Sequence, residues 1–160
     1  MIIVLIGVTG SGKTTVGRLL AQELRWKFYE GDKFHSPANV EKMKRGAPLT
    51  DADRLPWLES IRDIIRTAIE RGEDAVVACS ALKESYRRLL QIDDKVIFVY
   101  LNASRALVQE RLKFRIGHFM HPDLVPSQFD TLEEPKEGLQ IDAGLPAAEI
   151  VQLLRKHLSL

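Results

Sequence analysis

The chain has 160 residues, of which 45% are hydrophobic and 28% charged, the proportions of a soluble globular protein. A chain of this length buries roughly 70% of its unfolded surface, so we expect a single domain over residues 1–160. Its 23 Lys and Arg residues balance 22 Asp and Glu residues, and a net charge of +1 gives no support for binding to nucleic acid or to an anionic membrane.

Two features bear on cellular location. Cys79 is the only cysteine, so an internal disulfide is impossible and a reducing compartment is favoured; we expect this residue to be a small buried core residue. The apolar run at the start, Ile2–Ile6, is too short for a signal peptide core, and no other run approaches a membrane span. These features predict a cytoplasmic protein.

Strands and helices alternate along the sequence. Continuous β-branched and leucine runs predict strands buried on both faces of a parallel sheet, and apolar residues at helical spacing predict the helices between them. We expect strands at 2–6, 27–30, 74–79, 95–101 and 140–142, the last of them short. The helices are expected at 13–25, from about 55 to 72, at 105–115 and at 147–157. This alternation predicts an α/β fold with helices on both faces of the sheet.

A glycine-rich turn separates the first strand from the first helix. It fits G-x-x-x-x-G-K-[ST], the loop that binds nucleotide triphosphates between a strand and a helix. Its backbone N–H groups and the positive helix end would bind phosphate oxygens, Lys13 would reach the β- and γ-phosphates, and Thr14 would ligate Mg²⁺. The predicted nucleotide-binding residues are Gly7, Val8, Thr9, Gly10, Ser11, Gly12, Lys13, Thr14 and Thr15.

Other classes of nucleotide-binding protein are disfavoured. The D-x-x-G and [NT]-K-x-D elements of switch GTPases do not occur in the sequence, and the glycine order differs from the G-x-G-x-x-G of NAD and FAD folds. The strand at 74–79 runs into Ser80, whereas a motor or AAA-type ATPase usually has acidic residues there. Small-molecule kinases are the class of P-loop protein that remains compatible with the sequence.

The segment after the second strand supplies candidates for the acceptor side. Glu30, Asp32 and His35 are expected at the same sheet edge as the glycine-rich turn, because ligands of open α/β sheets bind at the carboxyl ends of the strands. A carboxylate there could orient or deprotonate a substrate hydroxyl, or hold a Mg²⁺-bound water. The alternative is a polar loop with a helix cap.

Residues 50–57 are expected to open the long helix, with Asp53 as its N-cap and Pro56 tolerated in its first turn. Arg54 opposes the helix dipole there, which indicates either an anionic partner, such as a substrate carboxylate, or a purely structural residue. After the third strand, Ser80 is expected to cap a helix and, with Lys83, to face the same rim.

The segment 117–138 has no clear periodicity and contains three prolines, which is typical of a functional lid or of disorder. Arg111 and Arg115 lie one helical turn apart just before it. Two arginines in that position suit neutralisation of transition-state charge beneath a closing lid, although an exposed basic face is the alternative. His118 and His121 have a spacing that suits a metal, but no further ligand cluster supports one.

Four blocks of the sequence resemble the thermoresistant gluconokinases. They are "GVTGSGKTTVGRLLAQEL", "FYEGDKFHSPANVEKMKRGAPLTDADRLPWL", "VVACSALKESYRRLL" and "RIGHFMHPDLVPSQFDTLEEP", and they agree with that family in order and spacing over nearly the whole chain. The nearest alternative is another kinase of the same fold, such as a shikimate kinase. That family places two aspartates two apart after the second strand, a pattern that Glu30 and Asp32 only approximate.

The resemblance implies a fold and an activity. The fold is a three-layer α/β/α P-loop kinase like adenylate kinase and shikimate kinase, with a five-stranded parallel sheet in the order 2-3-1-4-5, a substrate-binding segment at about 32–57 and a lid at about 115–137. The activity is transfer of the γ-phosphoryl group of ATP to the 6-hydroxyl of D-gluconate, with Mg²⁺. A homodimer is the commoner state of similar enzymes.

The resemblance also implies roles for individual residues. Lys13, Asp32 and Arg115 would be catalytic, with Asp32 as the base or orienting group for the acceptor hydroxyl. Arg111 and Arg115 would contact ATP, Arg111 nearer the adenine. The gluconate pocket would be lined by Asp32, His35, Arg54, Ser80, Lys83, His118 and Gln128. Glu30 stands where the family often has Asp, so its role is left open.

Overall fold

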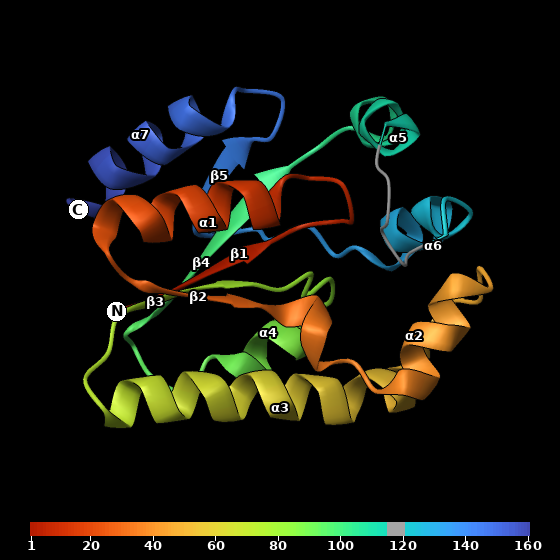
Figure 1. The fold of residues 1–160 in the computed structure, drawn as a ribbon, viewed down its shortest axis with the longest axis horizontal. Helices are drawn as coiled ribbons and strands as arrows, with labels where there is room; N and C mark the ends of the chain where they lie inside the picture. The colour runs from red at the N-terminus through yellow and green to blue at the C-terminus, as the bar shows by residue number, and fades with distance from the viewer. Residues whose placement is uncertain (115–120) are drawn as a thin grey trace.

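The structure is a computed structural model that describes residues 1–114 and 121–160. Its centre is a five-stranded parallel sheet in the order β2-β3-β1-β4-β5, which confirms the expected order (Figure 1). The strands are β1 (Ile2–Ile6), β2 (Lys27–Glu30), β3 (Ala75–Ala78), β4 (Val96–Asn102) and β5 (Leu139–Asp142).

The central strand shows why the sequence forms this sheet. β1 pairs with β3 on one side and β4 on the other, so all five of its side chains are buried. Successive side chains of a strand point to opposite faces, and Ile3 and Leu5 join one hydrophobic core while Ile2, Val4 and Ile6 join a second core on the other face. An unbroken apolar run is therefore what this position requires.

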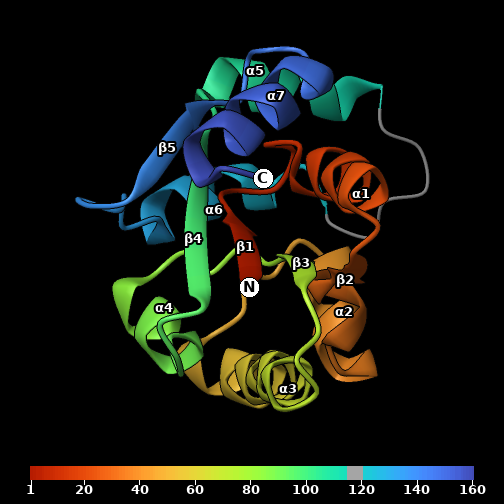
Figure 2. The same cartoon turned by 90° about the vertical axis from the view of Figure 1, so that its left-hand side faces the viewer.

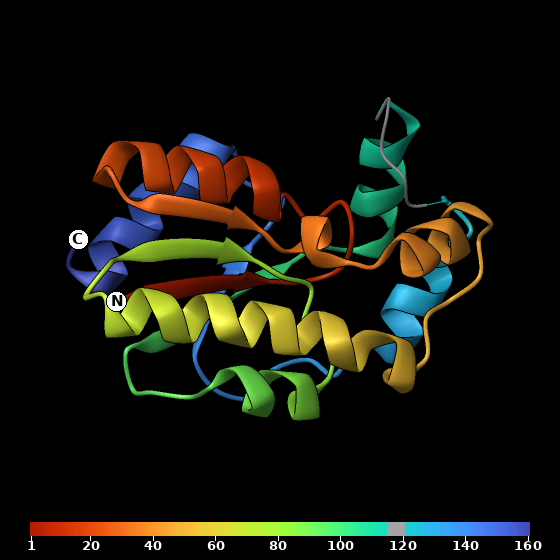
Figure 3. The same cartoon turned by 60° about the horizontal axis from the view of Figure 1, so that its bottom comes forward.

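Four helices cover the two faces of the sheet. α1 (Lys13–Leu24) packs against α7 (Ala147–Leu158) on one face, and α3 (Asp51–Glu70) packs against α4 (Glu84–Leu90) on the other (Figure 2). The remaining helices gather beyond the carboxyl ends of the strands (Figure 3). They are the 3-10 helix η1 (Gly31–Phe34), α2 (Pro37–Lys44), α5 (Arg105–Lys113) and α6 (Leu124–Thr131).

Three details at helix starts differ from the sequence-based expectations. The N-cap of α3 is Thr50, three residues earlier than expected. Asp53 is instead the third residue of the helix, and it forms a capping box with Thr50 in which each side chain accepts from the backbone N–H of the other. Pro56 consequently lies inside α3 and not in its first turn. Ser80 does not cap a helix: α4 begins only at Glu84, after Lys83.

Two α-helices, α2 and α6, were not expected from the sequence. α2 lies within the predicted substrate-binding segment, and α6 lies within the predicted lid at 115–137, whose residues 115–120 are outside the described part. No helix in residues 1–114 and 121–160 is long and apolar enough to cross a bilayer.

Candidate active site

A cavity of about 330 Å³ lies at the carboxyl ends of the strands. Its lining combines the glycine-rich loop, the segment after β2, the starts of α3 and α6, and the connection from β5 to α7. The predicted site residues that line it are Thr9, Gly10, Ser11, Gly12, Lys13, Thr14, Thr15, Asp32, His35, Arg54, Ser80, Arg111 and Gln128.

The glycine-rich loop has the conformation that its glycines permit. Gly7, Gly10 and Gly12 all have positive φ, at 147°, 76° and 97°. A Cβ at Gly7 would lie 2.8 Å from the carbonyl oxygen of Leu101, so the loop can pass β4 this closely only without a side chain. The Lys13 ammonium donates to the carbonyls of Gly7 (3.0 Å) and Val8 (2.8 Å). These two residues do not line the cavity themselves, but their carbonyls hold the Lys13 side chain in place.

The buried hydroxyl of Ser11 is suited to bind a phosphate group. Its hydroxyl is buried, belongs to a residue that lines the cavity, and has no hydrogen-bond partner among the described residues. Buried hydroxyls are normally satisfied, and a phosphate oxygen would satisfy this one.

The end of β2 and the 3-10 helix that follows it bring two carboxylates to the glycine-rich loop. The hydroxyl of Thr14 donates to the Glu30 carboxylate, and Asp32 lines the cavity from η1. Gly31 between them is required by packing, because a Cβ there would lie 2.3 Å from the carbonyl oxygen of Ala78 on β3. The close approach of β2 to β3 thus fixes where Asp32 leaves the sheet.

His35 lies in a stack with Trp57, with ring centroids 4.2 Å apart and an interplanar angle of 16°. The indole N–H of Trp57 donates to the carbonyl of Gly31 (2.8 Å), which fixes the indole against η1. Burial and, second, the positive charge of Arg54 lower the pKa of His35 to about 4. His35 is therefore neutral at pH 7 and presents a polar, uncharged ring to the cavity.

This pKa predicts a pH dependence of stability. Because the folded state resists protonation of His35, the unfolded state binds more protons between pH 4 and pH 6.5, and the free energy of unfolding should rise with pH across that window. The contribution approaches about 1.4 kcal/mol per pH unit. His35→Gln should flatten this part of the profile in urea titrations. An unchanged slope in His35→Gln would contradict the assignment.

Arg54 begins a chain of polar contacts at the rim. Arg54 is only 9% exposed; its guanidinium donates to the hydroxyl of Tyr86 (3.1 Å), and that hydroxyl donates to Asp51. Asp51 also pairs with the Lys83 ammonium at 2.9 Å. Lys83 therefore stands in an ion pair outside the cavity lining, and its expected contact with gluconate stays a prediction.

Two further residues fasten the far side of the cavity to the glycine-rich loop. Arg111 donates to the carbonyls of Gly10 (3.2 Å) and Ala143, and the amide oxygen of Gln128 accepts from the backbone N–H of Thr9 (3.2 Å). α5 and α6 are thereby joined to the loop that would bind the phosphates. The predicted site residues Arg115 and His118 lie outside the described residues.

Sequence reasoning missed some of the lining and its supports. Ala143 and Leu145 from the β5–α7 connection and Ala147 from the start of α7 line the cavity, and no motif marks them. Tyr86 acts through Arg54, 32 residues away, and Asn39 acts in part through Asp53, 14 residues away, so no local motif marks either residue. Cys79, by contrast, is buried as expected, and burial raises the pKa of its thiol to about 12, which leaves it without thiolate character.

The fold and this cavity define a class of protein. A G-x-x-x-x-G-K-T loop on a sheet of order 2-3-1-4-5, with an aspartate just after β2 and a buried arginine facing the same cavity, is the arrangement of a P-loop kinase that acts on a small molecule.

Comparisons with known proteins identify the family. The family model described as shikimate kinase matches residues 9–134. A gluconokinase from Gluconobacter oxydans (strain 621H) is 53% identical over 134 residues, covering 83% of this chain and 75% of that protein. An unliganded sugar kinase from Janibacter sp. HTCC2649 (39% identity, 99% and 94% of the two chains) superposes with a TM-score of 0.91. For a gluconokinase from Sinorhizobium meliloti 1021 (40% identity, 98% and 94%), the TM-score is 0.83. The chain belongs to the gluconokinase family.

Proposed function

We propose that this protein transfers the γ-phosphoryl group of ATP to the 6-hydroxyl of D-gluconate, giving 6-phospho-D-gluconate and ADP. The observation that carries the proposal is the single cavity that joins Lys13, Asp32 and Arg54. It offers a phosphate-binding loop, a carboxylate for a hydroxyl and a buried cation for a carboxylate, which are the groups that ATP and a sugar acid require. The family membership supports the same reaction.

The chain's own groups divide the chemistry. Asp32 accepts the proton of the 6-hydroxyl as its oxygen bonds to the γ-phosphorus, and the bond from phosphorus to the β,γ-bridging oxygen breaks to release ADP. Lys13 and the loop N–H groups stabilise the charge on the transferred group. Arg54 binds the carboxylate of gluconate, and neutral His35 contacts its hydroxyls. We further propose that Arg111 and Arg115 contact ATP and that Arg115 neutralises charge in the transition state.

The residues near Thr14 fit a magnesium ion. Mg²⁺ prefers oxygen ligands and usually takes one or two protein groups together with substrate phosphates. The Thr14 hydroxyl and the Glu30 carboxylate supply such a set, and no cluster of three or more His, Cys, Asp or Glu in the described residues offers a competing site. When bound, the ion would neutralise phosphate charge. Glu30, whose role the sequence left open, is the carboxylate we assign to it.

The proposal extends to the domain organisation, the rest of the gluconate pocket and the assembly. We infer a single domain over residues 1–160, with a substrate-binding segment at about 32–57 and a lid at about 115–137. Ser80, Lys83, His118 and Gln128 complete the gluconate pocket. We also infer a cytoplasmic homodimer without a nucleic-acid partner, on the strength of the family resemblance and the balanced charge.

A coupled assay of ADP release tests the function. Gluconate should be phosphorylated in preference to shikimate and to nucleoside monophosphates by at least about 10³-fold in kcat/KM, because a site built to pair a substrate's polar groups rejects analogues that leave those groups unpaired. Phosphorus NMR of the product should show a monoester at the 6-position. Turnover of shikimate without turnover of gluconate would replace this proposal with the shikimate-kinase alternative.

A further inference from the structure

The helix that carries the rim of the acceptor site has little apolar packing of its own. Only Asn39 and Met43 of α2 are buried. Met43 joins Leu49 and Leu124 in a three-residue cluster that is separate from the two cores on the sheet faces. Because apolar burial is the main force that holds a helix in place, α2 must depend on other contacts for its position.

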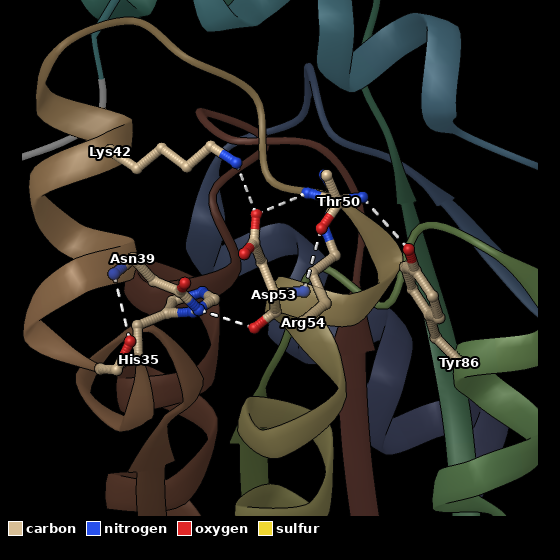
Figure 4. Close-up of polar contacts among 8 residues, drawn as sticks. His35, Asn39, Lys42, Thr50, Asp53, Arg54 and Tyr86 are labelled. Atoms are coloured by element: carbon tan, nitrogen blue, oxygen red, sulfur yellow. Dashed lines mark hydrogen bonds and ion pairs between the residues drawn. The ribbon is translucent and has the colours of Figure 1, made fainter.

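Asp53 supplies those contacts from the first turn of α3 (Figure 4). Its carboxylate pairs with the Lys42 ammonium of α2 at 2.7 Å, and its backbone carbonyl accepts from the side-chain amide of Asn39 at 2.8 Å. The same carboxylate oxygen accepts from the backbone N–H of Thr50 at 2.9 Å, which closes the capping box. One residue thus joins α2 to the start of α3 through both its side chain and its backbone.

The link continues to His35. A carbonyl oxygen can only accept, so the Asn39 atom bonded to Asp53 must be the NH₂ group. That same NH₂ group lies 3.5 Å from Nδ1 of His35, and this contact favours the tautomer in which Nδ1 is unprotonated. In that tautomer the ring proton is on Nε2, where it can be donated to a substrate hydroxyl.

The link also reaches Arg54, the next residue along α3. The capping box fixes the backbone of Asp53, and the backbone direction at Asp53 determines where Arg54 enters the cavity. His35 and Arg54 approach the cavity from different elements. Asp53 is hydrogen-bonded to Asn39, which contacts His35, and it directly precedes Arg54 in the sequence.

We propose that Asp53 is a positioning residue of the acceptor site, which docks α2 on α3 through Lys42 and Asn39 and thereby sets His35 and Arg54 at the separation that gluconate requires. The proposal rests on the proposed function, since it concerns the pocket for the same acceptor. Asp53 itself does not line the cavity and is not a catalytic residue.

A merely structural role would be the helix cap alone, and the two roles can be separated by mutation. Asp53→Asn keeps an oxygen for the Thr50 N–H but loses the charge that binds Lys42. Lys42→Met keeps the aliphatic stem and loses the other half of the pair. Thr50→Ala removes the hydroxyl that accepts from the Asp53 N–H (3.1 Å) and leaves both links to α2 in place. Asp63→Asn is a matched control, because Asp63 is an exposed partner of Arg66 on the same helix.

The test compares KM for gluconate, KM for ATP, kcat and the thermal midpoint among these variants and the Lys42→Met/Asp53→Asn double variant. We expect the gluconate KM to rise about tenfold in Asp53→Asn and in Lys42→Met, and no further in the double variant, because both remove one link. KM for ATP should stay within about twofold. Thr50→Ala should lower the midpoint by ~2–4 °C with gluconate KM within about twofold, and Asp63→Asn should change neither.

Several outcomes would overturn the proposal. An unchanged gluconate KM in Asp53→Asn and Lys42→Met would remove the positioning role, and so would an equal rise in Thr50→Ala or a parallel rise in KM for ATP. Calorimetric titration of each variant with gluconate provides a readout that does not depend on turnover. If the unmodified protein neither phosphorylates nor binds gluconate, the proposed function fails, which is a different result from wild-type turnover with unaffected variants.

Discussion

Asp32→Asn is expected to lower kcat by about 10²–10⁴-fold while the affinity for ATP stays within about twofold. Asp32 enters the cavity from η1, beside the loop that carries Lys13 and Thr14. The amide has nearly the same shape as the carboxylate but cannot accept the proton that the acceptor hydroxyl must lose. The loss should therefore fall on the chemical step and not on the binding of either substrate.

Single-turnover rates and equilibrium ATP binding measure the two effects separately. Asp94→Asn is a suitable control, because Asp94 is an exposed aspartate just before β4 begins, at the opposite edge of the sheet from the cavity. A normal rate in Asp32→Asn would exclude Asp32 as base or orienting group. A loss of ATP affinity as large as the loss of rate would instead indicate that Asp32 organises the nucleotide site.

The three inner strands of the sheet were predictable because they are largely buried, whereas β2 and β5 are partly exposed. The runs at β1, β3 and β4 are continuous and apolar, and such runs have few other stable environments in a chain of this composition. Strand order came from the family resemblance and not from periodicity. The α1 and α7 helices were equally legible, since both bury one stripe against the same core.

The helices at the functional end were not predictable in this way. α2 buries only two residues, and α6 carries Pro126 within a short helix in which Leu124, Val125 and Gln128 are buried. Neither has enough apolar residues to produce a 3.6-residue period. Their positions come from contacts with other elements, such as Gln128 with the N–H of Thr9, which lies 119 residues away.

The site residues likewise fall into a predictable group and an unpredictable one. The contiguous motif around Lys13 and the aspartate after β2 could be assigned because each group acts where its own segment places it. Long-range partners could not, since nothing near Arg54 in the sequence indicates that Tyr86 accepts its hydrogen bond. The start of α3 was misjudged because Thr50 and Asp53 are both good N-cap residues, and only the backbone shows which one takes the role.

Arg54→Ala is expected to raise the KM for gluconate by about 10–100-fold, which corresponds to the loss of a charge-assisted hydrogen bond worth ~1.5–3 kcal/mol. Arg54 is buried, and its guanidinium donates to the neutral hydroxyl of Tyr86. A buried cation in that state is costly to the fold, so an anionic ligand gains from pairing with it. KM for ATP should stay within about twofold.

The burial of Arg54 also predicts how Arg54→Ala affects stability, and this effect separates a binding role from a structural one. Removing the guanidinium relieves the cost of burying a charge, which offsets the packing and the Tyr86 bond that are lost, so the free energy of unfolding should change by less than about 1 kcal/mol. Arg66→Ala, which removes an exposed ion pair with Asp63 on the same helix, should change neither KM nor stability appreciably. Arg54→Lys should restore little of the binding, because an ammonium lacks the planar pair of N–H donors with which a guanidinium binds both oxygens of a carboxylate. A large loss of stability in Arg54→Ala with an unchanged KM for gluconate would make Arg54 a structural residue.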